Sequence, residues 1–168
     1  MKITDILNPG SSLAGWHALP LRLIVGYGFA EHGYAKLARG PDNFTGILHA
    51  LGMPFPELLA WATILIELGC GFAVLIGAFT RLTAIPMAVV LLVAIFTVHI
   101  GNGFSSIKLQ SVDAMGPHFG QPGAEADLLY LAGILALVLG GAGPWSIDRL
   151  LFQRLNRVDE TQRTDWRK

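Results

Sequence analysis

The chain has 168 residues, of which 52% are hydrophobic and 14% are charged, and its formal net charge is zero. Ordinary soluble domains carry about 25% charged residues, and a domain of this size cannot bury so much apolar surface in one core. The composition therefore favours a membrane protein over a soluble globule and gives no sign of a nucleic-acid partner.

Four apolar stretches follow one another along the chain, at residues 19–37, 58–79, 82–100 and 126–142. At 1.5 Å rise per residue, a helix of about 20 residues crosses the hydrocarbon core of a bilayer. We therefore predict an all-α fold, a four-helix transmembrane bundle that runs up-down-up-down as one membrane domain over residues 1–168. Residues 1–18 lack the apolar core of a cleavable signal, so we expect the first span to stay in the mature chain.

The segments between the predicted spans carry turn and loop signals. Glycines and prolines between residues 38 and 57 indicate a loop with a short helix near residues 44–51, and residues 79–81 form a tight turn. Residues 101–123 are rich in glycine, serine and proline, and we expect them to form a loop that roofs the bundle. Residues 146–168 form a charged tail, helical at its start.

The lysines and arginines predict an orientation. Four spans place both termini and the turn at Arg81 on one side of the membrane, and nine of the twelve cations lie on that side: Lys2, Arg22, Arg81, Arg149, Arg154, Arg157, Arg163, Arg167 and Lys168. Cytoplasmic segments carry the excess of positive charge, so we expect both termini in the cytoplasm. Separately, we expect a multi-pass protein of the plasma membrane, the bacterial inner membrane.

Ionisable residues inside the spans mark the expected functional region, because charges are expensive in lipid. With this topology, the half of the bundle away from the cytoplasm receives polar residues from all four spans: Glu31, His32, Lys36, Glu67, His99, Glu125, Asp127 and Tyr130. We therefore predict a polar cavity in that half of the bundle.

The chemistry of these side chains suggests separate roles. Carboxylates and an imidazole move protons, so the catalytic candidates are Glu67, His32 and Glu31. The candidates for substrate binding through hydrogen bonds are Lys36, His99, Glu125 and Tyr130. Arg22 and Arg81, at the cytoplasmic rim, are expected to be structural or to contact lipid headgroups.

Structural alternatives stand beside each role. Glu31 and Lys36 are also potential structural partners, His32 is a potential donor to a backbone carbonyl, and Glu67 a potential ion-pair partner of His32 or Lys36. No ligand-spacing motif predicts a metal site. The single cysteine, Cys70, excludes an internal disulfide or a CxxC redox pair.

Short fragments spread from Leu21 to Leu151 resemble the DoxX family of small membrane proteins, which is allied to the DoxD subunit of thiosulfate:quinone oxidoreductases. They are Leu21-Arg22, His32-Gly33-x-x-Lys36, Glu67-Leu68-x-x-Gly71, Gly77-x-x-Thr80-Arg81, His99, Asn102-Gly103-Phe104, Glu125 and Gly141-x-Gly143-x-x-Ser146-x-Asp148. The resemblance implies a four-helix membrane bundle. It also implies links to respiratory quinones, sulfur-compound oxidation and oxidative-stress defence.

Three functions are consistent with these observations. The leading hypothesis is a membrane subunit of a redox system that binds a quinone, as a candidate cofactor, in the polar cavity; whether the chain itself is an enzyme stays open. It would need a redox partner protein or a diffusible reductant as electron source. The alternatives are a non-enzymatic scaffold whose buried charges fix helix packing, and a small transporter, which would require a homo-oligomer.

Overall fold

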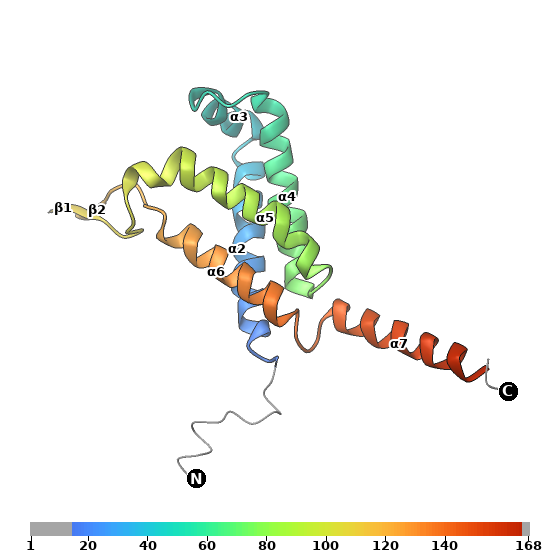
Figure 1. Cartoon of the computed structure of the whole chain (residues 1–168). Coiled ribbons are helices and arrows are strands. Elements are labelled where there is room, and N and C mark those ends of the chain that lie inside the picture. Colours follow the sequence, from blue (N-terminus) through green and yellow to red (C-terminus); the bar gives the residue numbers. More distant parts are fainter. Residues whose placement is uncertain (1–14, 166–168) are drawn as a thin grey trace, which may run out of the picture.

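The computed structural model describes residues 15–165, which are mostly helical (Figure 1). The helices are α2 (Ala18–Ala38), α3 (Pro41–Ala50), α4 (Pro56–Ile76), α5 (Thr80–Ala94), α6 (Glu125–Gly140) and α7 (Ile147–Asp165). A π-helical turn (Ile95–His99) and a 3₁₀ turn (Ile100–Asn102) extend α5. Residues 1–14 and 166–168, and with them the cations Lys2, Arg167 and Lys168, lie outside the described residues.

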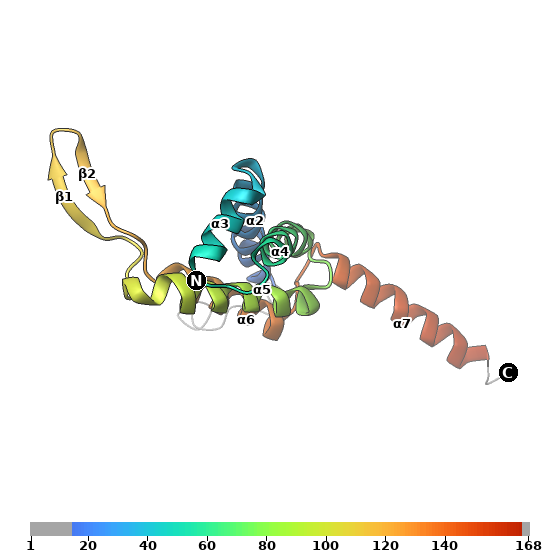
Figure 2. The ribbon, with the colours of Figure 1, turned by 90° about the horizontal axis from the view of Figure 1, so that it is seen from above.

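The prediction of an all-α chain is wrong in one segment. Strands β1 (Leu109–Asp113) and β2 (Gly116–Phe119) pair antiparallel as a hairpin in the segment expected to be a loop. Both strands are almost entirely exposed, and Figure 2 shows the hairpin standing apart from α2 and α4. It therefore does not roof the helices, because it points away from them.

Helices α2 and α4 lie side by side and form the most extensive helix pair of the described chain (Figure 1). Glycines permit this close approach: a Cβ on Gly33 would lie 3.0 Å from the Cβ of Glu67 and 2.9 Å from the backbone nitrogen of Leu68. Small residues at such contacts are typical of helix packing in membranes. The α2–α4 contact thus fixes which side chains of the two helices meet.

Helices α5 and α6 form a second pair that slants across the first (Figure 1). The buried apolar core lies where the two pairs cross and is made of Ala18, Val25, Phe29, Val74, Ala84, Met87, Leu91, Ile134 and Leu137. Elsewhere the helices expose many large apolar side chains, such as Leu65, Ile85 and Leu139, which are 63%, 64% and 74% exposed. A soluble protein rarely exposes apolar surface on this scale, and a lipid bilayer would cover it.

Two helices are long and apolar enough to cross a membrane: Pro56–Ile76, with mean hydropathy 2.1, and Thr80–Asn102, with mean hydropathy 2.3. The other two predicted spans are also helical. Helix α2 has 21 residues, but its arginine, glutamate, histidine and lysine lower its hydropathy, and α6 has only 16 residues. Length and hydropathy therefore identify two of the four expected spans.

The end of the molecule where α2 begins is held by Arg22. Its side chain is only 3% exposed, and its guanidinium donates to the carbonyls of Val74 and Leu75 at the end of α4. It also donates to three carbonyls of the turn after α6, those of Ala142, Pro144 and Trp145. The last carbonyls of a helix lack partners within it, so Arg22 supplies donors to groups at the end of α4 and in the turn after α6.

Candidate functional site

The central contact of the site is an ion pair between α2 and α4. The Nζ atom of Lys36 lies 2.7 Å from Oε1 and 2.6 Å from Oε2 of Glu67, so both carboxylate oxygens accept a hydrogen bond. The Glu67 side chain is 7% exposed and that of Lys36 is 22% exposed. A carboxylate buried in an apolar helix needs such a partner, because desolvation of an unpaired charge is costly.

Aromatic and imidazole rings surround this ion pair. The Phe44 ring of α3 has its centroid 5.1 Å from the Lys36 Nζ, within cation–π range. The exposed His32 interacts electrostatically with Glu67, and its ring lies 6.4 Å from the Tyr130 ring at 75°. We call His32, Lys36, Phe44, Glu67 and Tyr130 the Lys36–Glu67 cluster; it joins helices α2, α3, α4 and α6.

Tyr130 reaches the cluster because of a glycine and a phenylalanine on α2. Its ring packs edge-on against that of Phe29, with 5.7 Å between centroids. Its hydroxyl occupies the space beside Gly28, where a Cβ would clash with it. The α2 sequence thus places a phenol next to His32.

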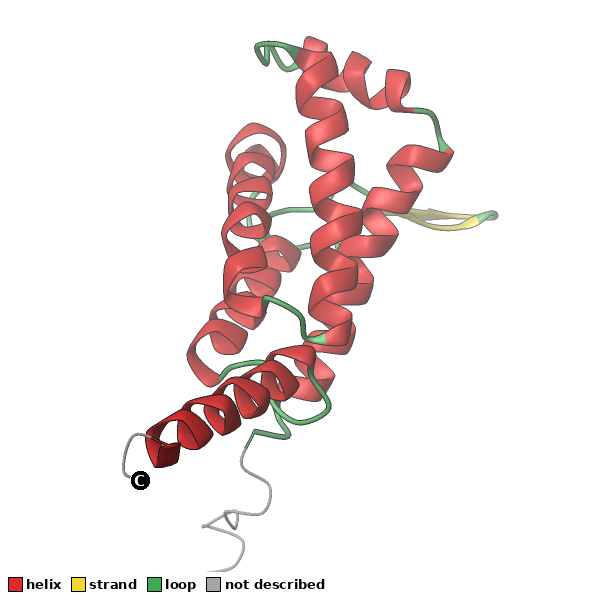
Figure 3. Cartoon of the chain, turned by 90° about the vertical axis from the view of Figure 1, so that its right-hand side faces the viewer, coloured by secondary structure: helices red, strands yellow, loops and turns green. Residues whose placement is uncertain are grey.

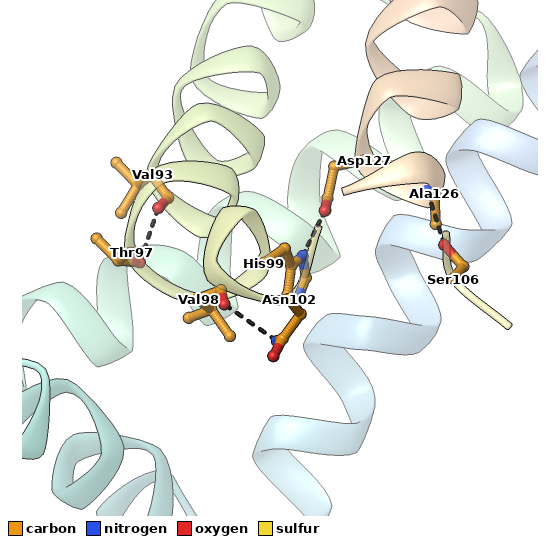
Figure 4. A network of polar contacts seen from close by, with 8 residues as sticks. All are labelled: Val93, Thr97, Val98, His99, Asn102, Ser106, Ala126 and Asp127. Atoms are coloured by element: carbon orange, nitrogen blue, oxygen red, sulfur yellow. Dashed lines mark hydrogen bonds and ion pairs between the residues drawn. The ribbon is translucent and has the colours of Figure 1, made fainter. Parts of the chain in front are cut away.

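A second polar group lies where the α5 extension meets the start of α6 (Figure 4). There His99 Nδ1 and Asp127 Oδ2 are in direct polar contact. Close by, Glu125 accepts a hydrogen bond from the Ser106 amide at 2.8 Å, and the Ser106 hydroxyl accepts one from the Ala126 amide at 3.1 Å. These bonds satisfy the α6 N-terminus and tie it to the segment that leads to the hairpin.

The structure thus divides the predicted site residues into two groups. His32, Lys36, Glu67 and Tyr130 come together in the Lys36–Glu67 cluster, whereas His99 and Glu125 belong to the second group. Glu31 lies on the exposed side of α2, and it makes no ion pair within residues 15–165. The reason is geometric: at 100° per residue, positions five apart on a helix point in different directions.

The two arginines also differ in their surroundings. Arg22 is buried among backbone carbonyls, as described above. Arg81 is exposed, and its Nε donates to the Val138 carbonyl at 3.1 Å.

Sequence reasoning placed Asp127 in the predicted cavity and Asp148 in a fragment resembling the family, without a specific role for either, and it did not single out Phe44; each has a role in the structure. Asp148 accepts hydrogen bonds from the amides of Phe79 at 2.6 Å and Thr80 at 2.9 Å, so it caps the N-terminus of α5. The signal for Asp127 was its spacing from a predicted site residue: it precedes Tyr130 by three residues, so the two side chains lie on a similar side of α6. Phe44 carried no signal, because only tertiary packing brings α3 over Lys36. Within residues 15–165, no three metal-ligating side chains gather to hold a metal ion.

Comparison with known proteins gives a consistent family assignment. The family model for DoxX matches residues 17–100, a range that contains Arg22, His32, Lys36, Glu67 and His99. An uncharacterized membrane protein of Mycobacterium tuberculosis is 30% identical over 141 residues, covering 80% of each chain. Two uncharacterized proteins of Haemophilus influenzae are 32% identical over 137 residues and 26% identical over 142 residues, and cover 80% and 82% of this chain and 90% and 85% of their own. No solved structure matches.

Proposed function

This chain belongs to the DoxX family of membrane proteins, and from that premise we propose that its Lys36–Glu67 cluster binds the headgroup of a quinone as part of a membrane redox system. The proposal includes a four-span topology with α2, α4, the extended α5 and α6 in the inner membrane and both termini in the cytoplasm. The apolar surface of these helices and the cation distribution support that topology.

The observation that carries the proposal is the buried Glu67 carboxylate in the middle of α4, the helix Pro56–Ile76 that is long and apolar enough to cross a membrane. A charge at this depth is expensive, and ionisable groups inside membrane segments commonly mark ligand or proton pathways. Its partner Lys36 keeps 22% of its side chain exposed, and His32 is exposed beside it. The cluster is therefore accessible from the side that carries these two bases.

The residues present fit a quinone headgroup, which needs hydrogen-bond donors at two carbonyl oxygens and an apolar surface for its ring. Lys36 has three N–H donors, of which Glu67 takes two. The His32 imidazole and the Tyr130 hydroxyl add further donors. Phe44 and Tyr130 supply aromatic faces.

A bound quinone would supply two-electron redox chemistry, accepting two protons with two electrons from a partner protein or a diffusible reductant. In this arrangement, His32 and Lys36 orient the headgroup by donating hydrogen bonds. Glu67, His32 and Lys36 form a short series of titratable groups able to hold and return a proton beside it.

Ligand analysis and titration test the proposal. Protein purified in mild detergent is extracted with organic solvent for mass spectrometry, and then titrated with a short-chain ubiquinone or menaquinone analogue. We expect a co-purified quinone and saturable binding that weakens about tenfold or more in Glu67→Gln and His32→Ala, the loss of one charged hydrogen bond. Glu57→Gln, on an exposed position of α4, is the matched control. Absence of quinone together with no saturable binding by the wild type would overturn the proposal.

One observation favours a second candidate function, that of a scaffold. Lys36 satisfies both oxygens of Glu67 without any ligand, which suits an ion pair whose role is to fix α2 against α4. A double-mutant cycle of Lys36→Met and Glu67→Gln, read by stability and by quinone binding, separates the two. A purely structural pair predicts large coupling in stability with no quinone binding, whereas a folded Glu67→Gln protein that has lost quinone binding contradicts the scaffold.

A further inference from the structure

Helix α7 carries an apolar face that the described chain leaves largely exposed. Ile147, Leu150, Leu151 and Leu155 follow the spacing of one helix face, and they are 36%, 58%, 39% and 66% exposed. Figures 1 and 3 show α7 leaving the end of the molecule where α2 begins and running away from the other helices. An amphipathic helix with a largely exposed apolar side therefore extends from the rest of the molecule.

The structure fixes where this helix starts. The Ser146 hydroxyl accepts a hydrogen bond from the Arg149 amide at 3.3 Å, which caps α7. One residue into the helix, the Asp148 carboxylate binds the first turn of α5, and the Asp148 amide donates to the Gly77 carbonyl at 2.9 Å. The first turn of α7 is thus held where α4 ends and α5 begins, which are the ends of the two helices long and apolar enough to cross a membrane.

Two tryptophans mark the same level. Trp16 and Trp145 pack edge to face with 5.2 Å between ring centroids, and they are 38% and 76% exposed. Tryptophan is enriched at the boundary between headgroups and acyl chains, because its ring is apolar and its N–H is polar. Helix α7 follows Trp145 directly, so it begins at that boundary.

The charges of the first three turns of α7 complement a lipid surface, whereas over the whole helix four arginines balance four acidic residues. Its first three turns carry Arg149, Arg154 and Arg157, against Asp148, whose carboxylate is occupied by the α5 amides. Arginines favour anionic phosphate groups, and their long side chains reach the headgroups from a helix lying at the surface. Helix α7 is too charged to span the bilayer, and an apolar face opposite polar residues in a helix of low overall hydropathy is typical of an interfacial helix.

We propose that α7 lies on the membrane surface as an interfacial helix, with Ile147, Leu151 and Leu155 at the acyl boundary and its arginines on the phosphates of anionic lipids. This binding surface anchors the C-terminal segment at the base of the membrane helices. The proposal does not depend on what the Lys36–Glu67 cluster binds.

Site-directed spin labelling of the full chain in nanodiscs tests the proposal. Cys70 is the single cysteine, so Cys70→Ala provides a background for Leu155→Cys and Gln153→Cys, two residues apart on opposite sides of α7. Both positions are exposed in the chain itself, so any difference between them reports what surrounds α7 in the membrane. Collision rates with oxygen, which partitions into lipid, and with a water-soluble nickel chelate give the depth of each label.

In nanodiscs that contain phosphatidylglycerol, we expect a higher oxygen-to-nickel collision ratio at position 155 than at position 153. Pure phosphatidylcholine, or the double substitution Arg149→Gln and Arg154→Gln, should reduce this difference; the ratio of bound to unbound α7 should fall about fivefold for each arginine replaced. Equal ratios at the two positions in phosphatidylglycerol nanodiscs would overturn the proposal. Protection from both reagents, or dipolar broadening between labels of two copies, would also overturn it, because either result indicates a protein partner instead of lipid.

Discussion

Gly26 of α2 and Gly71 of α4 face each other so closely that a Cβ built on either residue would lie 2.8 Å from the carbonyl oxygen of the other. This contact sets the separation of α2 and α4 near the Lys36–Glu67 pair, because Glu67 lies about one turn from Gly71 and Lys36 nearly three turns from Gly26. The geometry of the Lys36–Glu67 cluster thus depends on glycines that carry no chemistry of their own.

Gly71→Ala tests this dependence. The new Cβ would lie 2.6 Å from the backbone nitrogen of Ala30, so the helices must separate, and we expect a loss of about 1–3 kcal/mol in stability. Gly69→Ala is the matched control on the same helix, since nothing lies within 4 Å of its Cβ, and it should be neutral or slightly stabilising. Thermal unfolding in detergent micelles measures both variants. Equal midpoints would show that α2 and α4 tolerate a wider spacing.

Arg22→Lys tests the role of the buried guanidinium. An ammonium cannot reproduce the planar fork that serves carbonyls of both α4 and the turn after α6, so we expect a loss of about 1.5–3 kcal/mol. Arg81→Lys, at an exposed arginine with one carbonyl partner, should change stability by less than about 0.5 kcal/mol. A wild-type melting temperature for Arg22→Lys would assign Arg22 a role outside the folded core, such as lipid binding.

Asp148→Ala should loosen the start of α5. The amides of Phe79 and Thr80 lose their acceptor, at a cost of about 1 kcal/mol for a missing helix cap, and their hydrogen exchange should accelerate. Asp113→Ala, which removes the acceptor of the Met115 amide in the exposed hairpin, should leave exchange in α5 unchanged. Unaltered exchange at residues 79–80 in Asp148→Ala would contradict the capping role.

The two histidine–aspartate pairs predict different costs for the same substitution. His99→Ala leaves the largely buried Asp127 carboxylate without its partner, and we expect a loss of about 1–3 kcal/mol together with faster proteolysis of residues 103–124. His118→Ala breaks a pair whose side chains are 51% and 56% exposed, and should cost no more than about 1 kcal/mol. Similar losses in the two variants would mean that burial does not determine the strength of these pairs.

The positions of the helices follow from the sequence. The predicted spans at residues 19–37, 58–79, 82–100 and 126–142 fall on α2, α4, the extended α5 and α6, because long apolar runs between glycine and proline breaks leave few alternatives to helix. The predicted all-α fold is confirmed in part, since the described chain is mostly helical but contains the β1–β2 hairpin, and the resemblance to the DoxX family is confirmed. The four-span topology and the quinone site stay predictions.

The sequence by itself thus determined the membrane character, the helices and the small set of ionisable residues inside the apolar stretches. The reason is that hydropathy, helical periodicity and the cost of burying a charge can each be read from a local segment of the chain. Only the tertiary structure decided that Lys36 pairs with Glu67 and not with Glu31, that His99 pairs with Asp127, and that Arg22 is enclosed by carbonyls. These pairings depend on how each helix is rotated and how closely it approaches its neighbour. Both are set by contacts between residues far apart in the chain, such as Gly26 and Gly71, which no single segment encodes.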